Sequence, residues 1–157
     1  MSAQTLNVRL INQRAPGECL AACAAMVLDY LGRPQPYASL LRLLDIKPHG
    51  APFTNLYTLQ RIGVRVLHER NRTFDQLRNH LAAGHPCIVP VFTGELPYWQ
   101  GVRTFHVVVV AALKSDLVYV VDPAFSTPLI GVEFGDFELA WIERGQEIAT
   151  LRLTSAG

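Results

Sequence analysis

The sequence predicts an α+β fold in which N-terminal helices, including a central buried one, pack on a C-terminal antiparallel β-sheet. The first observation is an apolar stretch from Cys19 to Leu31 with one charged residue, Asp29, which predicts a helix buried on nearly all sides. The second is that helical signals fill the first half of the chain, whereas β-rich runs follow Gly84. Because helices and strands are segregated rather than alternating, an antiparallel sheet is favoured over a parallel one.

The composition indicates a compact globular chain. Of its 157 residues 50% are hydrophobic and 17% are charged, and the net charge is +1, which excludes disorder and a global attraction to nucleic acid or anionic lipid. The apolar runs are shorter than the about 18 residues of a membrane span. The N-terminus lacks the basic and apolar regions of a secretory signal. Three cysteines do not suit a disulfide framework, so we expect reduced thiols and a cytoplasmic protein. We expect a single domain over residues 1–157.

The helices have recognisable ends. The buried helix follows the turn Pro16-Gly17-Glu18 and stops at Gly32, so Cys19 lies at or next to its first turn. A capping-box pattern of Thr73 with Gln76 starts a later helix. The shorter helices are expected at about Tyr37 to Leu44, Thr54 to Ile62 and Thr73 to Ala82, with a short strand from Val64 to Leu67 before the last of them.

The second half of the chain predicts strands joined by short turns. Lys114-Ser115-Asp116 is a polar link typical of a β-hairpin. If this link is centred near Ser115, Asp122 lies opposite the stretch that begins at His106, so the two side chains become neighbours. The strands are expected at Cys87 to Phe92, Thr104 to Leu113, Leu117 to Val121, Leu129 to Val132 and Ile148 to Leu153, with a short acidic helix near Phe137 to Trp141.

Cys19, His106 and Asp122 form a candidate nucleophilic site. The free N–H groups and the positive dipole end of a helix N-terminus stabilise a thiolate. A histidine oriented by a carboxylate can take the thiol proton, as nucleophilic acyl transfer requires. Each residue also has a structural interpretation: a core cysteine, a strand-end histidine with satisfied hydrogen bonds, and an aspartate that starts a turn before Pro123.

The segment from Gln13 to Gly32, QRAPGECLAACAAMVLDYLG, resembles the active-site segment of the bacteriocin-processing peptidases, which are papain-like cysteine peptidases that remove double-glycine leader peptides. The shared features are a glutamine six positions before the nucleophile, an acidic residue just before it, and a helix that continues through small and apolar residues to glycine. The run from His106 to Val110 is similar to the histidine strand of the family, and Val121-Asp122-Pro123 is similar to its Asp-Pro end. The resemblance implies a papain-like fold and a peptidase that needs no cofactor.

The resemblance also implies a role for each residue. Cys19 attacks the scissile carbonyl, His106 acts as base and then as acid, and Asp122 orients the imidazole. Gln13 and the Cys19 backbone N–H hold the oxyanion. The chain has neither the Walker motif nor the membrane helices of the transporter-linked family members, so it is expected to be a stand-alone peptidase acting on a peptide or protein substrate.

Three further residues are expected to bind substrate. Leu20 stands where the family usually has glycine, so its side chain is expected to narrow or reshape the cleft beside the thiol. Tyr98 and Trp99 lie in a glycine-flanked loop and are expected to border the cleft, unless the loop packs against its own strands. Leu20 also favours another class of protein, a catalytically silent module that binds a leader-like or C-terminal tail. A deconjugating enzyme or acyl transferase for a ubiquitin-like Gly-Gly terminus would use the same catalytic residues.

The remaining cysteines, histidines and arginines are not expected to form sites. Cys23, one turn after the candidate nucleophile, is assigned to the core because no CxxC or HExxH pattern supplies further metal ligands. A turn and a buried strand explain the group of His80, His85 and Cys87 more simply than zinc does. The basic stretch from Arg61 to Arg78 lacks interleaved aromatic residues, so nucleic acid is not expected as a partner. We therefore expect no metal and no cofactor.

Overall fold

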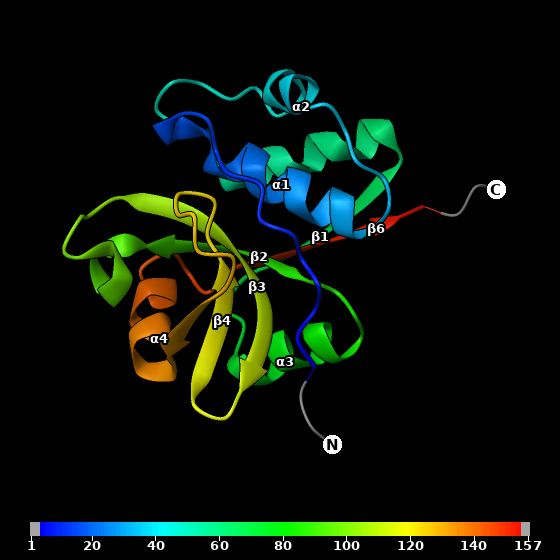
Figure 1. The fold of residues 1–157 in the computed structure, drawn as a ribbon. Helices are drawn as coiled ribbons and strands as arrows, with labels where there is room; N and C mark the ends of the chain where they lie inside the picture. The colour runs from blue at the N-terminus through cyan, green and yellow to red at the C-terminus, as the bar shows by residue number, and fades with distance from the viewer. Residues whose placement is uncertain (1–3, 155–157) are drawn as a thin grey trace.

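The structure is a computed structural model that describes residues 4–154, and its centre is a six-stranded sheet (Figure 1). The strand order is β1-β6-β2-β3-β4-β5, and every neighbouring pair is antiparallel. The antiparallel sheet expected from the segregation of helices and strands is therefore confirmed. The strands are β1 (Val64–Glu69), β2 (Cys87–Phe92), β3 (Phe105–Lys114), β4 (Leu117–Val121), β5 (Ile130–Glu133) and β6 (Ile148–Leu153).

Helices cover both sides of this sheet: α1 and α2 lie on one side, and α3 and α4 lie on the other (Figure 1). Most lie where the sequence predicts, although the segment expected as a helix from Thr54 is a 3₁₀ helix and the acidic helix starts at Phe134. None of the described helices combines the length and the apolar content needed to cross a bilayer. The elements are η1 (Pro16–Glu18), α1 (Cys19–Tyr30), α2 (Tyr37–Leu43), η2 (Phe53–Ile62), α3 (Phe74–Ala82), η3 (Thr93–Glu95), η4 (Pro97–Trp99) and α4 (Phe134–Ile142).

Helix α1 is buried because nearly all of its side chains are apolar and many are small. Every residue from Leu20 to Leu28 is buried, and the alanines let the helix approach β3 closely. The Sγ of Cys23 donates a hydrogen bond to the Val107 carbonyl oxygen at 3.4 Å. The first turns of α1 therefore lie directly against the start of β3, and Cys23 is a core residue as expected.

Next to the turn of the β3–β4 hairpin, Lys114 pairs with Leu117, which is one residue away from the register of a link centred at Ser115. A register shift between Val110 and Ala112 then produces the pairing that the link predicts. Val109 pairs with Val121, and Ser115 adopts the left-handed conformation of a tight turn, with φ of 52°. Residues two apart on a strand share a face of the sheet. Because Asp122 directly follows β4, its side chain lies diagonally across from His106 on that same face.

Candidate active site

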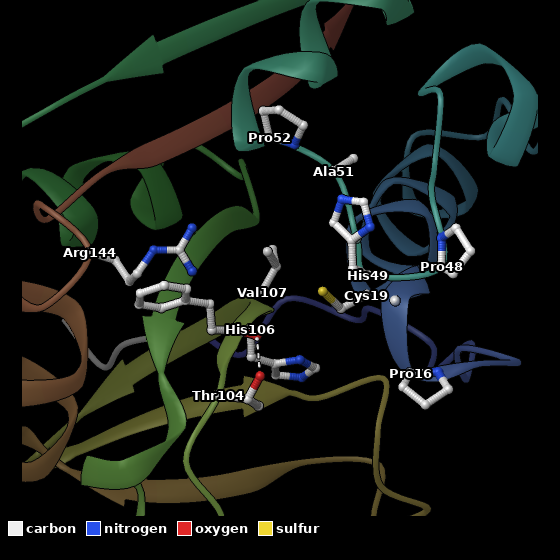
Figure 2. Close-up of a pocket in the computed structure, with 13 residues that line it drawn as sticks. Pro16, Cys19, Pro48, His49, Ala51, Pro52, Thr104, His106, Val107 and Arg144 are labelled. Atoms are coloured by element: carbon white, nitrogen blue, oxygen red, sulfur yellow. Dashed lines mark hydrogen bonds between the residues drawn. The ribbon is translucent and has the colours of Figure 1, made fainter.

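A cleft of about 540 Å³ opens between the N-terminus of α1 and the start of β3 (Figure 2). This volume is in the range of ligand-binding pockets in proteins. The cleft brings the side chains of Cys19 and His106 to one surface, as Figure 2 shows. Its lining consists of Pro16, Gly17, Cys19, Pro48, His49, Gly50, Ala51, Pro52, Thr104, Phe105, His106, Val107 and Arg144.

Cys19 is the first residue of α1 and is half-buried. The 3₁₀ turn η1 leads into it, with Pro16 at a position where a missing N–H costs nothing. The backbone of Gly17 packs so closely on the neighbouring loop that a Cβ there would lie 2.4 Å from the Pro48 carbonyl oxygen and 2.8 Å from the Gly50 nitrogen. Only glycine fits at this contact, which fixes the loop as one wall of the cleft beside the thiol.

His106 and Asp122 form a buried pair behind the thiol. Nε2 of His106 is 2.7 Å from Oδ1 of Asp122, and the two side chains are 3% and 0% exposed. The other ring nitrogen, Nδ1, is therefore not engaged by Asp122, and the Cys19 side chain lies in the same cleft lining as the imidazole. This is the arrangement of nucleophile, base and orienting carboxylate that acyl transfer requires.

The charges of this pair stabilise one another. Burial opposes the imidazolium, but hydrogen bonds to Asp122 and Cys19, and the charges of both, raise the pKa of His106 to about 9. Burial likewise opposes the carboxylate, but its hydrogen bond with His106 and the imidazolium charge lower the pKa of Asp122. His106 therefore stabilises the fold fully at pH values below its ordinary pKa of 6.5, and this contribution is lost as pH rises through about 9. Asp122 stabilises the fold at pH values above its ordinary pKa of 3.8, and this contribution is lost as pH falls through its lowered pKa.

Tyr98 and Trp99 donate hydrogen bonds to Asp122, and neither is among the residues that line the cleft. The Tyr98 hydroxyl is 2.6 Å and the Trp99 Nε1 is 3.1 Å from Oδ2, while the Ala124 N–H lies 2.9 Å from Oδ1. The Trp99 ring also stands edge-on to the imidazole of His106, with 4.9 Å between ring centroids. The expectation that both residues border the cleft is wrong, because a buried carboxylate requires donors and η4 directs both side chains to it.

Leu20 also lies outside the cleft. Its side chain is 2% exposed and belongs to the core. Successive residues of a helix point about 100° apart, so a thiol at Cys19 that faces the cleft places the next side chain under the helix. The expected narrowing of the cleft by Leu20 is therefore wrong, and with it goes the one sequence feature that favours a catalytically silent binding module.

Gln13 lies in the segment before η1 but is not part of the cleft lining. Its amide Nε2 donates to the carbonyl oxygens of Ala15 and Pro16, both at 3.3 Å, and its Oε1 is buried without a hydrogen-bond partner among the described residues. Bonds of this length are weak for N–H donors. The amide is thus next to the helix N-terminus, with donors that are only loosely engaged.

Asn12 is a supporting residue that the sequence analysis did not identify. Its Nδ2 donates to the carbonyl oxygens of Pro123 at 2.9 Å and Phe125 at 2.7 Å, and the Gln13 backbone N–H donates to Pro123 at 3.0 Å. These bonds tie the segment before η1 to the loop that follows Asp122. An asparagine beside the glutamine carries no sequence signal for this, because its partners are backbone groups far along the chain.

Cys23, Cys87 and His80 take structural places, whereas His49 lines the cleft. Burial raises the pKa of both the Cys23 and the Cys87 thiol. Nε2 of His80 is 2.6 Å from Oε1 of Glu69. Over residues 4–154, no three His, Cys, Asp or Glu side chains come together in a way that could hold a metal ion.

Replacement of Tyr98 by phenylalanine removes one of the two donors to Oδ2 of Asp122. We expect Tyr98→Phe to cost about 1.5–3 kcal/mol of unfolding free energy, because the lost hydrogen bond reaches a buried charged group. It should lower kcat and leave KM close to the wild-type value, since Tyr98 contacts Asp122 and not the cleft. Urea unfolding and steady-state kinetics measure the two effects. A raised KM with unchanged kcat would instead restore a substrate-binding role for Tyr98.

Three solved structures share this fold at low sequence identity. A Bacillus anthracis protein classed as C39-like matches with a TM-score of 0.81 and 17% identity, over 97% of this chain and 98% of that one. A double glycine motif protease from an AMS/PCAT transporter, in complex with the leader peptide, matches with a TM-score of 0.74 and 20% identity, over 98% and 99%. The peptidase domain of Streptococcus ComA, a bifunctional ABC transporter, matches with a TM-score of 0.75 and 18% identity, over 94% of this chain and 100% of that one. The fold is that of papain-like C39 peptidase domains.

The family model described as Peptidase_C39 like family matches residues 5–149, and the chain belongs to this family. The match includes the segment before α1, the start of β3 and the residue after β4, from which Cys19, His106 and Asp122 come. No curated protein matches the sequence. The family assignment that the motif resemblance implies is therefore confirmed.

Proposed function

We propose that this chain is a cysteine peptidase that hydrolyses a peptide bond through an acyl-enzyme on Cys19. The observation that carries this proposal is the 2.7 Å hydrogen bond between His106 and Asp122 beside a cysteine at a helix N-terminus, with the thiol and the imidazole in one cleft. The raised pKa of His106, about 9, keeps its imidazole protonated at neutral pH, where it can pair with a thiolate. The membership of the chain in a peptidase family supports the same reaction.

The reaction proceeds in two halves. The thiolate of Cys19 attacks the carbonyl carbon, and a C–S bond forms as the carbonyl electrons move to oxygen. Collapse of this tetrahedral species breaks the C–N bond, and His106 gives its proton to the leaving amine. Water then loses a proton to His106 and attacks the thioester, which releases the carboxylic acid and the thiolate. Asp122 holds the imidazole in orientation throughout.

The oxyanion requires donors at the N-terminus of α1. The Cys19 backbone N–H belongs to the first turn, where N–H groups point out of the helix end. The Gln13 amide is the second proposed donor, and it would exchange one of its two 3.3 Å bonds to carbonyl oxygens for a bond to the oxyanion. A negatively charged acceptor makes this exchange favourable.

The proposed substrate is a peptide or protein cleaved after a Gly-Gly motif. Burial of Leu20 leaves the cleft beside the thiol unobstructed by that side chain. A relative of the same fold, named a double glycine motif protease, has been seen in complex with the leader peptide. We place the enzyme in the cytoplasm, because the free thiols of Cys19, Cys23 and Cys87 suit a reducing compartment. We propose neither a nucleic acid nor a membrane as its partner.

Matched peptides test this proposal. Peptides that differ only in a central Gly-Gly, Ala-Ala or Leu-Leu pair are incubated with the wild type and with Cys19→Ala, and the products are identified by mass spectrometry. We expect a product that ends in Gly-Gly and only with the wild type. Equal cleavage of the three peptides would reject the Gly-Gly preference. A protein that cleaves only an isopeptide between a Gly-Gly terminus and lysine is a deconjugating enzyme, and that result would replace the proposed substrate.

A further inference from the structure

The cleft wall formed by β3 carries a cation stacked on an exposed aromatic ring. The guanidinium carbon of Arg144 lies 4.6 Å from the ring centroid of Phe105, the first residue of β3 and the neighbour of His106. Phe105 is 67% exposed, although the next eight residues of the strand are buried. Both residues line the cleft, and Figure 2 shows Arg144 on the same side as β3, facing the cleft that holds Cys19.

The guanidinium of Arg144 is half-buried and has donors to spare. None of the ion pairs found among residues 4–154 involves it. The hydrogen bond recorded for its side chain in that part of the chain is a long one, from Nη1 to the Val91 carbonyl oxygen at 3.5 Å. Burial lowers its pKa, while the charges of Glu147 and Cys19 act in the opposite direction. A guanidinium has five N–H donors, so most of those of Arg144 are available to a ligand.

The position of this arginine is set by the turn that follows α4. The Arg144 backbone N–H donates to the Trp141 carbonyl oxygen at 3.0 Å. The buried indole of Trp141 donates to the Glu147 carbonyl oxygen at 2.9 Å, and Gly145 adopts a left-handed φ of 76°. The turn is thus anchored on both sides of Arg144. The backbone that carries Arg144 is therefore fixed, and the contact of its guanidinium with the Phe105 ring restricts the side chain before a partner binds.

The lining of the cleft is positively biased. It includes the guanidinium of Arg144 and the imidazole of His106, and none of the described residues that line it is an aspartate or glutamate. The carboxylate that pairs with His106, Asp122, is fully buried behind the imidazole. Because the charges of the proposed Cys19–His106 pair offset one another, the guanidinium of Arg144 is the charge in the lining that can attract an anionic group.

We propose that Arg144 and Phe105 form a subsite that binds a carboxylate of the peptide substrate, which makes Arg144 a specificity-determining residue. This inference rests on the proposed peptidase function and adds the chemistry of the substrate. The guanidinium offers parallel N–H donors that match a carboxylate, and the exposed ring of Phe105 supports the carbon chain that carries it. The carboxylate belongs either to an acidic side chain near the scissile bond or to the C-terminus of the peptide.

Peptide binding to a protein without the nucleophile tests this subsite. Fluorescein-labelled, C-terminally amidated peptides with a Gly-Gly pair carry one Glu at successive positions and are compared with the same peptides carrying Gln, by fluorescence anisotropy with Cys19→Ala. We expect Glu to bind about tenfold more tightly than Gln at one or two neighbouring positions, as a charge-assisted hydrogen bond provides. If the bound carboxylate is that of the C-terminus, the gain in affinity appears only in a peptide made with a free C-terminal carboxyl group.

Three second-site variants identify the residue responsible. Arg144→Gln should abolish the preference for the carboxylate, and Arg144→Lys, which keeps the charge but loses the parallel donors, should retain part of it. Arg65→Gln removes an exposed charge from the edge strand β1, remote from the cleft, and should leave the preference unchanged. Thermal unfolding establishes that each variant is folded.

Two results would overturn the subsite. One is equal binding of the carboxylate and amide peptides at every position, including no binding of either. The other is a carboxylate preference that persists in Arg144→Gln. Because all of these proteins lack the Cys19 thiol, the measured preference for a carboxylate does not depend on catalysis. The wild type can fail to cleave peptides while the binding preference is present, and it can cleave peptides while the binding preference is absent.

Discussion

Cys19→Ala is expected to lower peptide turnover about 10⁶-fold, the loss that removal of an enzyme nucleophile gives. The substitution removes the sulfur atom that forms the acyl bond. Because the Cys19 side chain is half-buried at the helix start, its loss should leave the melting temperature close to that of the wild type. Initial rates on the best-cleaved peptide and thermal unfolding of the same samples measure both effects.

Cys23→Ala is the matched control, one helical turn further along α1. It removes a buried thiol and its hydrogen bond to the Val107 carbonyl oxygen, so we expect a loss of about 1 kcal/mol of unfolding free energy. Turnover should remain, because Cys23 does not line the cleft. A fully active Cys19→Ala protein, or an inactive but folded Cys23→Ala protein, would contradict the assignment of the nucleophile.

Asp122→Ala is expected to have the second largest effect, on both stability and catalysis. The carboxylate accepts hydrogen bonds from His106, Tyr98, Trp99 and Ala124, so its removal leaves the buried imidazole and three further donors without their partner. Breaking a buried ion pair by removing one member costs about 3–5 kcal/mol. Loss of the orienting carboxylate also costs about 10⁴-fold in kcat in nucleophilic triads. Urea unfolding measures the loss of unfolding free energy, and turnover at urea concentrations where the variant stays folded measures the loss of kcat.

Two comparisons separate these contributions. Asp122→Asn keeps the volume of the side chain but not its charge, and should recover part of the stability while kcat stays low. Asp116→Ala changes an exposed aspartate in the hairpin turn and should alter the unfolding free energy by no more than about 0.5 kcal/mol. An Asp122→Ala protein with wild-type stability and turnover would show that the carboxylate does not orient His106.

The parts of the site that the sequence predicts are those fixed by local patterns. The apolar stretch and its turn place Cys19 at the start of a helix, and the polar link at Ser115 sets the register of one hairpin. Asp122 comes next to His106 only after a register shift between Val110 and Ala112, which no local pattern predicts. The capping box of Thr73 is likewise present, because its hydrogen bonds join residues within one helical turn.

The parts that the sequence does not predict depend on distant packing. Arg144 follows α4 and precedes β6, and it reaches the cleft because β6 lies beside β2 and β2 beside β3 in the sheet, an order that no local pattern encodes. Leu20, Tyr98 and Trp99 were expected in the cleft from their nearness in sequence to catalytic residues. Their burial and hydrogen bonds are set by the core and by Asp122, which sequence spacing does not show.

The central claim is a thiolate–imidazolium pair of Cys19 and His106. The most direct test is the rate of iodoacetamide alkylation at each cysteine as a function of pH, measured by mass spectrometry. Because the pKa of His106 is raised to about 9, its imidazolium should be present at neutral and mildly acidic pH, where it can stabilise the nucleophilic form of Cys19. Cys23 and Cys87, whose burial raises their pKa values, should react slowly throughout and serve as internal references. The expected result is rapid modification of Cys19 at mildly acidic pH that is lost in His106→Ala. Slow modification of Cys19 in the wild type, or a rate unchanged in His106→Ala, would contradict the pair and the proposed catalysis with it.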